Sequence, residues 1–73
     1  MNLNGYEVYY EGETPCIRNA QDGWYRIYRV DGNLVKEAKI ESNEQTIENL
    51  SQGIYILNIY GQGECLQTKI LIP

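Results

Sequence analysis

Hydrophobic and polar side chains alternate with a period of two along most of the chain. In residues 6–11, Tyr6, Val8 and Tyr10 fall on one face, which is typical of a half-buried β-strand. The alternation recurs between turn signals and predicts seven short strands, at residues 6–11, 16–18, 24–30, 34–40, 46–48, 54–60 and 64–72. Turns every eight to twelve residues are typical of a small Ig-like antiparallel β-sandwich. We therefore predict a single all-β domain over residues 1–73.

Three of these runs indicate which side chains form the core. The run 54–60 is apolar on both faces for four residues, as in a central strand, and Asn58 marks its more polar face. The core is therefore expected on the opposite face of that run. The side chains that share a predominantly apolar face are Tyr25 with Ile27, Tyr55 with Leu57 and Ile59, and Leu66 with Thr68, Ile70 and Ile72.

Glycine and aspartate residues mark the turns between these runs. Asp31-Gly32 lies between two β-rich runs, favours positive φ and predicts a tight hairpin. Pro15 fits only the start or the edge of a strand, because proline has no N–H to donate. The residues singled out for turn or structural roles are Gly12, Gly23, Asp31, Gly32 and Gly53.

Residues 41–52 offer the one competing prediction of secondary structure, a helix. Ser42 and Gln45 have the spacing of a capping box. The segment nevertheless has too small an apolar stripe to bury against a core, because Asn49, Ser51 and Gly53 interrupt it. We therefore predict a strand and turns here.

Composition and charge exclude several classes of function. The chain has 73 residues and no histidine, which removes Ser-His and Cys-His nucleophiles and imidazole metal sites. The net charge is −4, whereas nucleic-acid binding requires clustered Lys and Arg. No apolar run approaches the roughly 20 residues that span a bilayer. We expect no enzymatic activity, no cofactor, no nucleic-acid partner and no membrane span.

The two cysteines, Cys16 and Cys65, leave two alternatives open. A disulfide would close a loop of about 50 residues and contribute roughly 4 kcal/mol, which suits a small extracellular domain. Free cysteine is also a common small core residue, and we favour two thiols over the disulfide. A catalytic thiol is not expected, because no base is present to activate it.

Aromatic and acidic residues each allow a functional interpretation beside a structural one. Trp24 with Tyr9, Tyr28 and Tyr60 could form a platform for sugar, but cross-strand aromatic pairs explain them better. Two acidic clusters lack the dense alternation of a calcium-binding loop, so we interpret them as solvated strand faces. These clusters are Glu7, Glu11 and Glu13, and Glu41, Glu44 and Glu48.

Five sequence blocks carry a resemblance to a known family. They are Val8-Tyr9-Tyr10-Glu11-Gly12, Asn19-Ala20-Gln21-Asp22-Gly23, the segment 25–35 around Asp31-Gly32, the segment 46–57 ending in Gly53-Ile54-Tyr55-Ile56-Leu57, and Gln67-Thr68-Lys69-Ile70-Leu71-Ile72. In this order and spacing they resemble the C-terminal sorting domain of the type IX secretion system of Bacteroidetes. The resemblance covers residues 6–73.

The resemblance implies a seven-stranded Ig-like sandwich, in agreement with the strand count, and a non-enzymatic function. Domains of this kind direct cargo through the periplasm to the cell surface or the extracellular space. The implied partners are an outer-membrane secretion translocon and a sortase-like peptidase that cleaves just upstream, after which the cargo is attached to surface lipopolysaccharide. The chain would then be the C-terminal part of a longer exported protein.

The last strand is the segment we expect a secretion partner to recognise. It offers an exposed backbone edge or a short tail, to which a partner could add a strand. The predicted recognition residues are Lys69, Ile70, Leu71, Ile72 and Pro73. The alternative function is an Ig-like extracellular binding or spacer module that contacts a carbohydrate or another protein.

Overall fold

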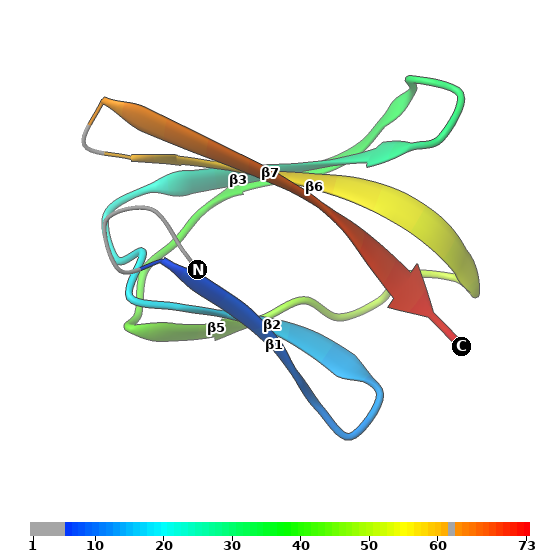
Figure 1. Cartoon of the computed structure of the whole chain (residues 1–73), viewed down its shortest axis with the longest axis horizontal. Helices are drawn as coiled ribbons and strands as arrows, with labels where there is room; N and C mark the ends of the chain where they lie inside the picture. Colours follow the sequence, from blue (N-terminus) through cyan, green and yellow to red (C-terminus); the bar gives the residue numbers. More distant parts are fainter. Residues whose placement is uncertain (1–5, 62) are drawn as a thin grey trace.

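The computed structural model describes residues 6–61 and 63–73, and this part of the chain forms two antiparallel sheets and no helix (Figure 1). The all-β sandwich predicted from the alternation is confirmed, as is the rejection of a helix over residues 41–52. The strands are β1 (Glu7–Glu11), β2 (Thr14–Arg18), β3 (Trp24–Arg29), β4 (Leu34–Lys39), β5 (Glu44–Thr46), β6 (Gly53–Gly61) and β7 (Glu64–Ile72).

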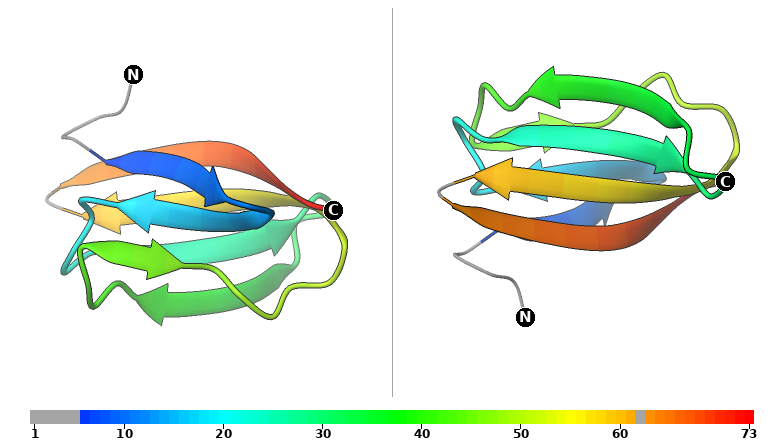
Figure 2. Two further views of the ribbon diagram at one scale, coloured as in Figure 1. Left: turned by 90° about the horizontal axis from the view of Figure 1, so that it is seen from below. Right: turned by 90° about the horizontal axis from the view of Figure 1, so that it is seen from above.

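The sheets contain three and four strands, in the orders β1-β2-β5 and β4-β3-β6-β7. Figure 2 shows the sheets stacked, with β1 on the same side of the sandwich as β7 and β5 on the same side as β4. In this order β4 pairs with β3, whereas the constant-type immunoglobulin arrangement keeps its fourth strand beside the fifth. The edges of the three-stranded sheet are β1 and β5, and the edges of the four-stranded sheet are β4 and β7.

The core lies between the sheets and is made of inward-facing side chains from both. The central position predicted for residues 54–60 is confirmed, because β6 lies between β3 and β7, and Leu57 and Ile59 are fully buried. Val8, Ala38, Leu50, Leu66 and Ile72 pack against the core from its margins. The buried core residues are Tyr6, Ile17, Ala20, Tyr25, Ile27, Ile40, Ile47, Tyr55, Leu57, Ile59 and Ile70.

The β3–β4 hairpin turns through a three-residue loop, residues 30–32. The N–H of Gly32 donates to the carbonyl of Arg29, and the N–H of Arg29 donates to the carbonyl of Asn33, each at 2.9 Å. Gly32 has φ of 96°, so the loop combines a turn with a left-handed residue that creates a bulge. The carboxylate of Asp31 accepts from the backbone N–H of Asn33 at 3.1 Å, which fixes the far side of the loop.

The fifth strand was predicted in the wrong place, at residues 46–48. β5 is instead Glu44–Thr46, and it pairs with β2 from Cys16 to Arg18. Ile47, just beyond the strand, is buried and donates its N–H to the carbonyl of Pro15 at 2.9 Å. The error has a physical cause: the three residues of β5 carry no apolar alternation, and pairing with the neighbouring strand defines them.

The other strands lie close to their predicted positions. β7 has the predicted bounds. β1, β3 and β4 differ by one residue at one end, β6 is one residue longer at both ends, and β2 begins two residues earlier. Pro15 is the second residue of β2. Its carbonyl accepts from the N–H of Ile47, but proline has no N–H to return a second bond, and the ladder to β5 therefore runs only from Cys16. The predicted turn at residues 61–63 includes Gln62, which lies outside the described residues.

Candidate recognition surface

The predicted recognition residues lie at the C-terminal end of β7, the edge strand of the four-stranded sheet. Alternate side chains of this segment have opposite environments. Ile70 is in the core and Ile72 packs against it, whereas Leu71 is 54% exposed. Lys69 and Pro73 are also exposed. The segment is thus anchored by two apolar side chains and presents the others outward.

The backbone of the same segment faces away from its neighbouring strand at every second residue. The N–H of Leu71 donates to the hydroxyl of Tyr10 at 2.9 Å, so the backbone groups of Leu71 point outward from β6. Because the β6–β7 register is continuous, the backbone groups of Lys69 point the same way. The edge of β7 therefore carries backbone hydrogen-bonding groups, one of which is capped by a side chain of β1.

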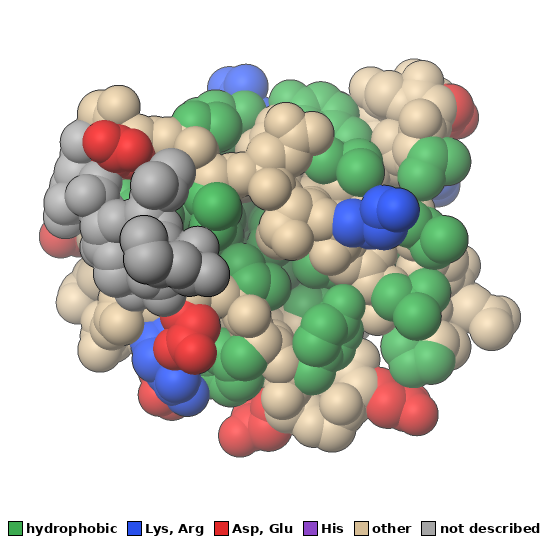
Figure 3. Space-filling model, viewed as in Figure 1, with side chains coloured by type: hydrophobic (Ala, Val, Ile, Leu, Met, Phe, Trp, Pro, Cys, Tyr) green, Lys and Arg blue, Asp and Glu red, His purple; other side chains and the backbone are tan. Residues whose placement is uncertain are grey.

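Figure 3 shows the side of the sandwich where the edge strands β1 and β7 lie, with hydrophobic side chains spread over it and acidic ones near the margins. Tyr10, 46% exposed, spans from β1 to β7 across this side. The partly buried side chains of Val8, Leu66 and Ile72 pack against the core from these two strands. The strand β7 thus borders a partly apolar surface.

The outer face of the four-stranded sheet is aromatic at the end away from Leu71. Trp24 on β3 lies opposite Tyr60 on β6, and the next outward pair along β3 and β4 is Arg26 with Glu37. These four side chains line a hollow of about 370 Å³. The hydrogen bond from Arg26 Nε to Glu37 raises the pKa of Arg26, and Tyr28 contributes further.

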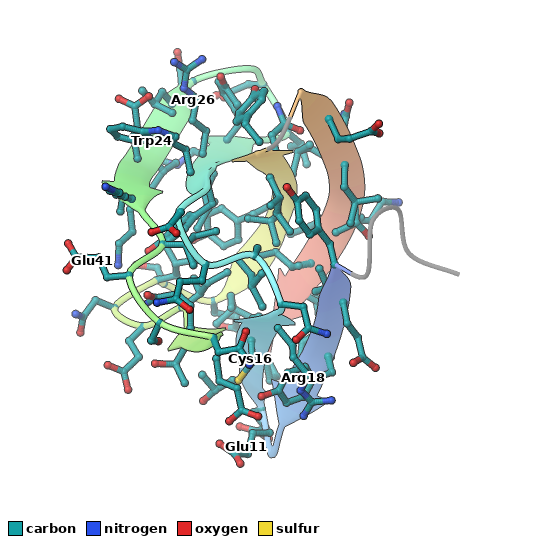
Figure 4. The ribbon with its side chains drawn as sticks, turned by 90° about the vertical axis from the view of Figure 1, so that its left-hand side faces the viewer. Glu11, Cys16, Arg18, Trp24, Arg26 and Glu41 are labelled. Atoms are coloured by element: carbon teal, nitrogen blue, oxygen red, sulfur yellow. The ribbon has the colours of Figure 1, made fainter. Side chains whose placement is uncertain are left out.

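The four aromatic residues considered as one platform are divided between the two sheets. Trp24, Tyr28 and Tyr60 share the outer face of the four-stranded sheet, and Trp24 and Tyr60 form a cross-strand pair. Tyr9 lies on β1, in the other sheet, so a platform of all four is excluded. Figure 4 shows Trp24 and Arg26 together, with Cys16 and Arg18 of β2 in the other sheet.

The outer face of the three-stranded sheet carries a cross-strand network centred on Arg18. Its guanidinium binds Glu7 at 2.9 Å and Glu44 at 3.4 Å, and lies 4.1 Å from the centroid of the Tyr9 ring. The hydrogen bond with Glu7 raises the pKa of Arg18. Desolvation raises the pKa of Tyr9, with a smaller contribution from Glu44. Two members of the predicted acidic clusters thus bind an arginine.

The two cysteines are free thiols, in agreement with the favoured alternative and not with a Cys16–Cys65 disulfide. Cys16 is fully buried on β2, whereas Cys65 is exposed on β7, in the other sheet. Cys16 Sγ lies 3.6 Å from the carbonyl oxygen of Thr14. In residues 6–61 and 63–73, no group of three or more Cys, Asp or Glu residues is arranged to hold a metal ion.

Two features of these surfaces were not predicted from the sequence. One is the hydrogen bond from Leu71 to Tyr10, which joins residues 61 positions apart. The other is the pairing of Arg26 with Glu37 beside Trp24, which depends on the register of three strands. The Asp-Gly turn could have indicated the second pairing, since it places β3 opposite β4.

A family model of the secretion system C-terminal sorting domain matches residues 16–73. The chain belongs to this family. The resemblance seen in the sequence is therefore confirmed, and the match includes the whole four-stranded sheet and β5. Neither a search of curated proteins nor a search of solved structures finds a match.

Membership defines the general function of this sorting domain. It is a C-terminal sorting signal for type IX secretion, which implies interaction with the secretion machinery and export toward the cell surface or extracellular space. The family is not an enzyme family. In the described residues, no helix is long and apolar enough to cross a membrane. The alternative function as a separate binding or spacer module has no support from the family match.

Proposed function

We propose that this sorting domain is the C-terminal part of a longer exported protein and delivers that protein through the outer-membrane translocon of the type IX system. A sortase-like peptidase then cleaves just upstream of the domain, and the cargo is attached to surface lipopolysaccharide. The domain crosses the periplasm in transit and acts as a recognition element.

We further propose that the translocon recognises the C-terminal end of β7. The observation that carries this proposal is the arrangement of Lys69 to Pro73 on an edge strand. The anchored side chains hold the strand in place, while Lys69 and Leu71 present their side chains to a partner. Lys69 also presents outward-facing backbone groups, whereas the N–H of Leu71 is bound to the Tyr10 hydroxyl. An extended segment can pair with such an edge by strand addition.

Reporter export tests the proposal. A secreted reporter fused to residues 1–73 should reach the surface of a host with type IX machinery, and deletion of residues 69–73 should abolish delivery. The deletion also removes Ile70 from the core, so substitutions are needed that leave the fold intact. Lys69→Glu and an extension after Pro73 alter the exposed end of the strand without removing core side chains.

Leu71→Glu and Leu34→Glu form the matched pair for this test. The two leucines are 54% and 52% exposed, and both lie on edge strands of the four-stranded sheet. Leu71→Glu should reduce surface delivery strongly, and Leu34→Glu should leave it near the level of the unmodified domain. Equal delivery by both variants, with circular dichroism showing both folded, would refute recognition at β7. No delivery by the intact folded domain would refute the sorting function itself.

A further inference from the structure

The hollow on the outer face of the four-stranded sheet lies apart from the recognition strand. Its two aromatic side chains, Trp24 and Tyr60, lie opposite each other on β3 and β6, and Tyr60 pairs with Cys65 at the start of β7. The residues proposed for recognition lie at the opposite end of β7, where Leu71 pairs with Ile54. The chemistry of the hollow therefore needs an explanation separate from that of the recognition strand.

The hollow combines an open aromatic surface with charged groups that neutralise one another. The Trp24 side chain is 50% exposed, and tryptophan offers a broad apolar ring face. Arg26 donates to Glu37 from the neighbouring strand, and its guanidinium lies 5.4 Å from the centroid of the Tyr60 ring. The Arg26–Glu37 pair carries no net charge, so the hollow attracts neither anions nor cations strongly.

A hydrogen bond from Asn58 determines how the hydroxyl of Tyr60 can interact with a ligand. The Nδ2 of Asn58 donates to the Tyr60 oxygen at 3.1 Å, which leaves the phenolic hydrogen available to donate. Asn58 Oδ1 is buried and has no hydrogen-bond partner in the described part of the chain.

Together these groups match the surface of a sugar ring. A pyranose has an apolar C–H face that stacks on an indole, and neighbouring hydroxyls that both donate and accept hydrogen bonds. The remaining N–H groups of Arg26 and the Tyr60 hydroxyl can donate, and the carboxylate of Glu37 can accept. The size of the hollow, about 370 Å³, lies within the range of small-ligand sites.

We propose that the hollow lined by Trp24, Arg26, Glu37 and Tyr60 binds a neutral pyranose unit of a glycan, as an activity additional to sorting. A neutral sugar fits better than an acidic one, because the charged pair is self-neutralised and the chain carries a net charge of −4. A proline-rich peptide also stacks on aromatic rings. It offers few donors for the Glu37 carboxylate, however, and therefore fits less well.

Sugar binding in the hollow can be measured directly by tryptophan fluorescence. Trp24 is the single tryptophan of the chain, so tryptophan fluorescence, excited at a wavelength where tyrosine does not absorb, reports on the hollow alone. The purified chain is titrated with the methyl pyranosides of glucose, mannose and galactose, and with sodium glucuronate and a proline-rich peptide for comparison. We expect a saturable change with at least one neutral pyranoside, with a dissociation constant on the order of 1 mM.

Matched variants separate a built site from general stacking on an exposed indole. Tyr60→Phe and Glu37→Gln should each weaken binding at least about fivefold. The first removes the hydroxyl that donates, and the second replaces one acceptor oxygen by a donor NH2 and removes the charge that holds Arg26 in place. Leu34→Ala, on an exposed side chain of the same sheet, should leave binding unchanged. Amide chemical shifts verify that each variant is folded.

Three results would overturn the inference. The first is the absence of any saturable change with the three pyranosides up to about 100 mM. The second is equal affinity in the Tyr60→Phe and Glu37→Gln variants, and the third is tighter binding of glucuronate or the peptide than of every neutral pyranoside. None of these results bears on reporter export, which tests the sorting function separately.

Discussion

The outer face of the three-stranded sheet is mainly polar, whereas the outer face of the four-stranded sheet also exposes large apolar side chains. On the three-stranded sheet, Arg18 binds Glu7 and Glu44 and lies against the Tyr9 ring, so the charged side chains bind one another across the strands. On the four-stranded sheet, Trp24, Ile54 and Leu71 are about half exposed, and the last two lie opposite each other on β6 and β7. Grouped exposed apolar side chains are typical of interaction surfaces. The difference supports the proposal that partners approach the four-stranded sheet.

The two sheets also differ in the length of their ladders. The β6–β7 ladder joins nine residue pairs, whereas the β2–β5 ladder joins three. Long ladders bury alternate side chains on a continuous core face, and β6 contributes Tyr55, Leu57 and Ile59 in this way. The same sheet that exposes apolar groups on its outside therefore supplies much of the core on its inside.

The largest expected effect is on the core of the four-stranded sheet. Leu57→Ala removes a fully buried side chain from the central strand β6 and should lower the free energy of unfolding by about 2–5 kcal/mol. Urea denaturation followed by circular dichroism measures it. A change close to zero would mean that Leu57 is not in the core.

A smaller loss is expected at the β3–β4 loop. Gly32 has φ of 96° with open space around it, so Gly32→Val is opposed by backbone strain alone and should cost about 1–3 kcal/mol. Gly32→Asn is the control, because asparagine tolerates positive φ better. Equal unfolding free energies for the two variants would contradict the conformation given to this loop.

The cap between the sheets should contribute less again. Tyr10→Phe removes the acceptor for the N–H of Leu71 and should cost about 0.5–1.5 kcal/mol. Amide hydrogen exchange should accelerate at Leu71 while remaining unchanged at Ile70, whose side chain is in the core. Unchanged exchange at Leu71 would show that Tyr10 does not protect the edge of β7.

The reactivity of the two thiols tests the difference between the sheets without a change in stability. Cys65 is exposed on the four-stranded sheet, whereas Cys16 is fully buried in the three-stranded one. A colourless disulfide reagent that releases a coloured thiolate should therefore modify one cysteine per folded chain and two after denaturation. Cys65→Ser should abolish the reaction of the folded chain, and modification of Cys16 at native rates would contradict its burial.

The sequence predicted the four-stranded sheet better than the three-stranded one, and the reason is physical. The residues of β7 alternate over nine positions, so their bounds follow from the pattern alone. β5 has only Glu44, Gln45 and Thr46, and its place depends on pairing with β2. The position of a short polar strand is set by its neighbour, which a local pattern does not contain.

The surface features, too, divide into those that a local pattern predicts and those that depend on how strands are placed. The exposed ends of Lys69 and Leu71 follow from alternation along one strand. The Tyr10 cap and the Arg26–Glu37 pair beside Trp24 require the relative placement of two sheets and the register of several strands. Sequence reasoning could therefore name the residues of the aromatic hollow only in part, and it grouped Tyr9 with them wrongly.

Site-specific photo-crosslinking in a type IX-competent host tests most directly the claim that the secretion machinery approaches β7. A photoreactive amino acid is placed at Leu71 on β7 or at Thr46 on β5, two exposed positions on the edge strands of opposite sheets. In exporting cells, the probe at position 71 should yield an adduct with an outer-membrane component of the machinery, and the probe at position 46 should yield none. An adduct from position 46 with none from position 71, in variants that are both exported, would contradict the account.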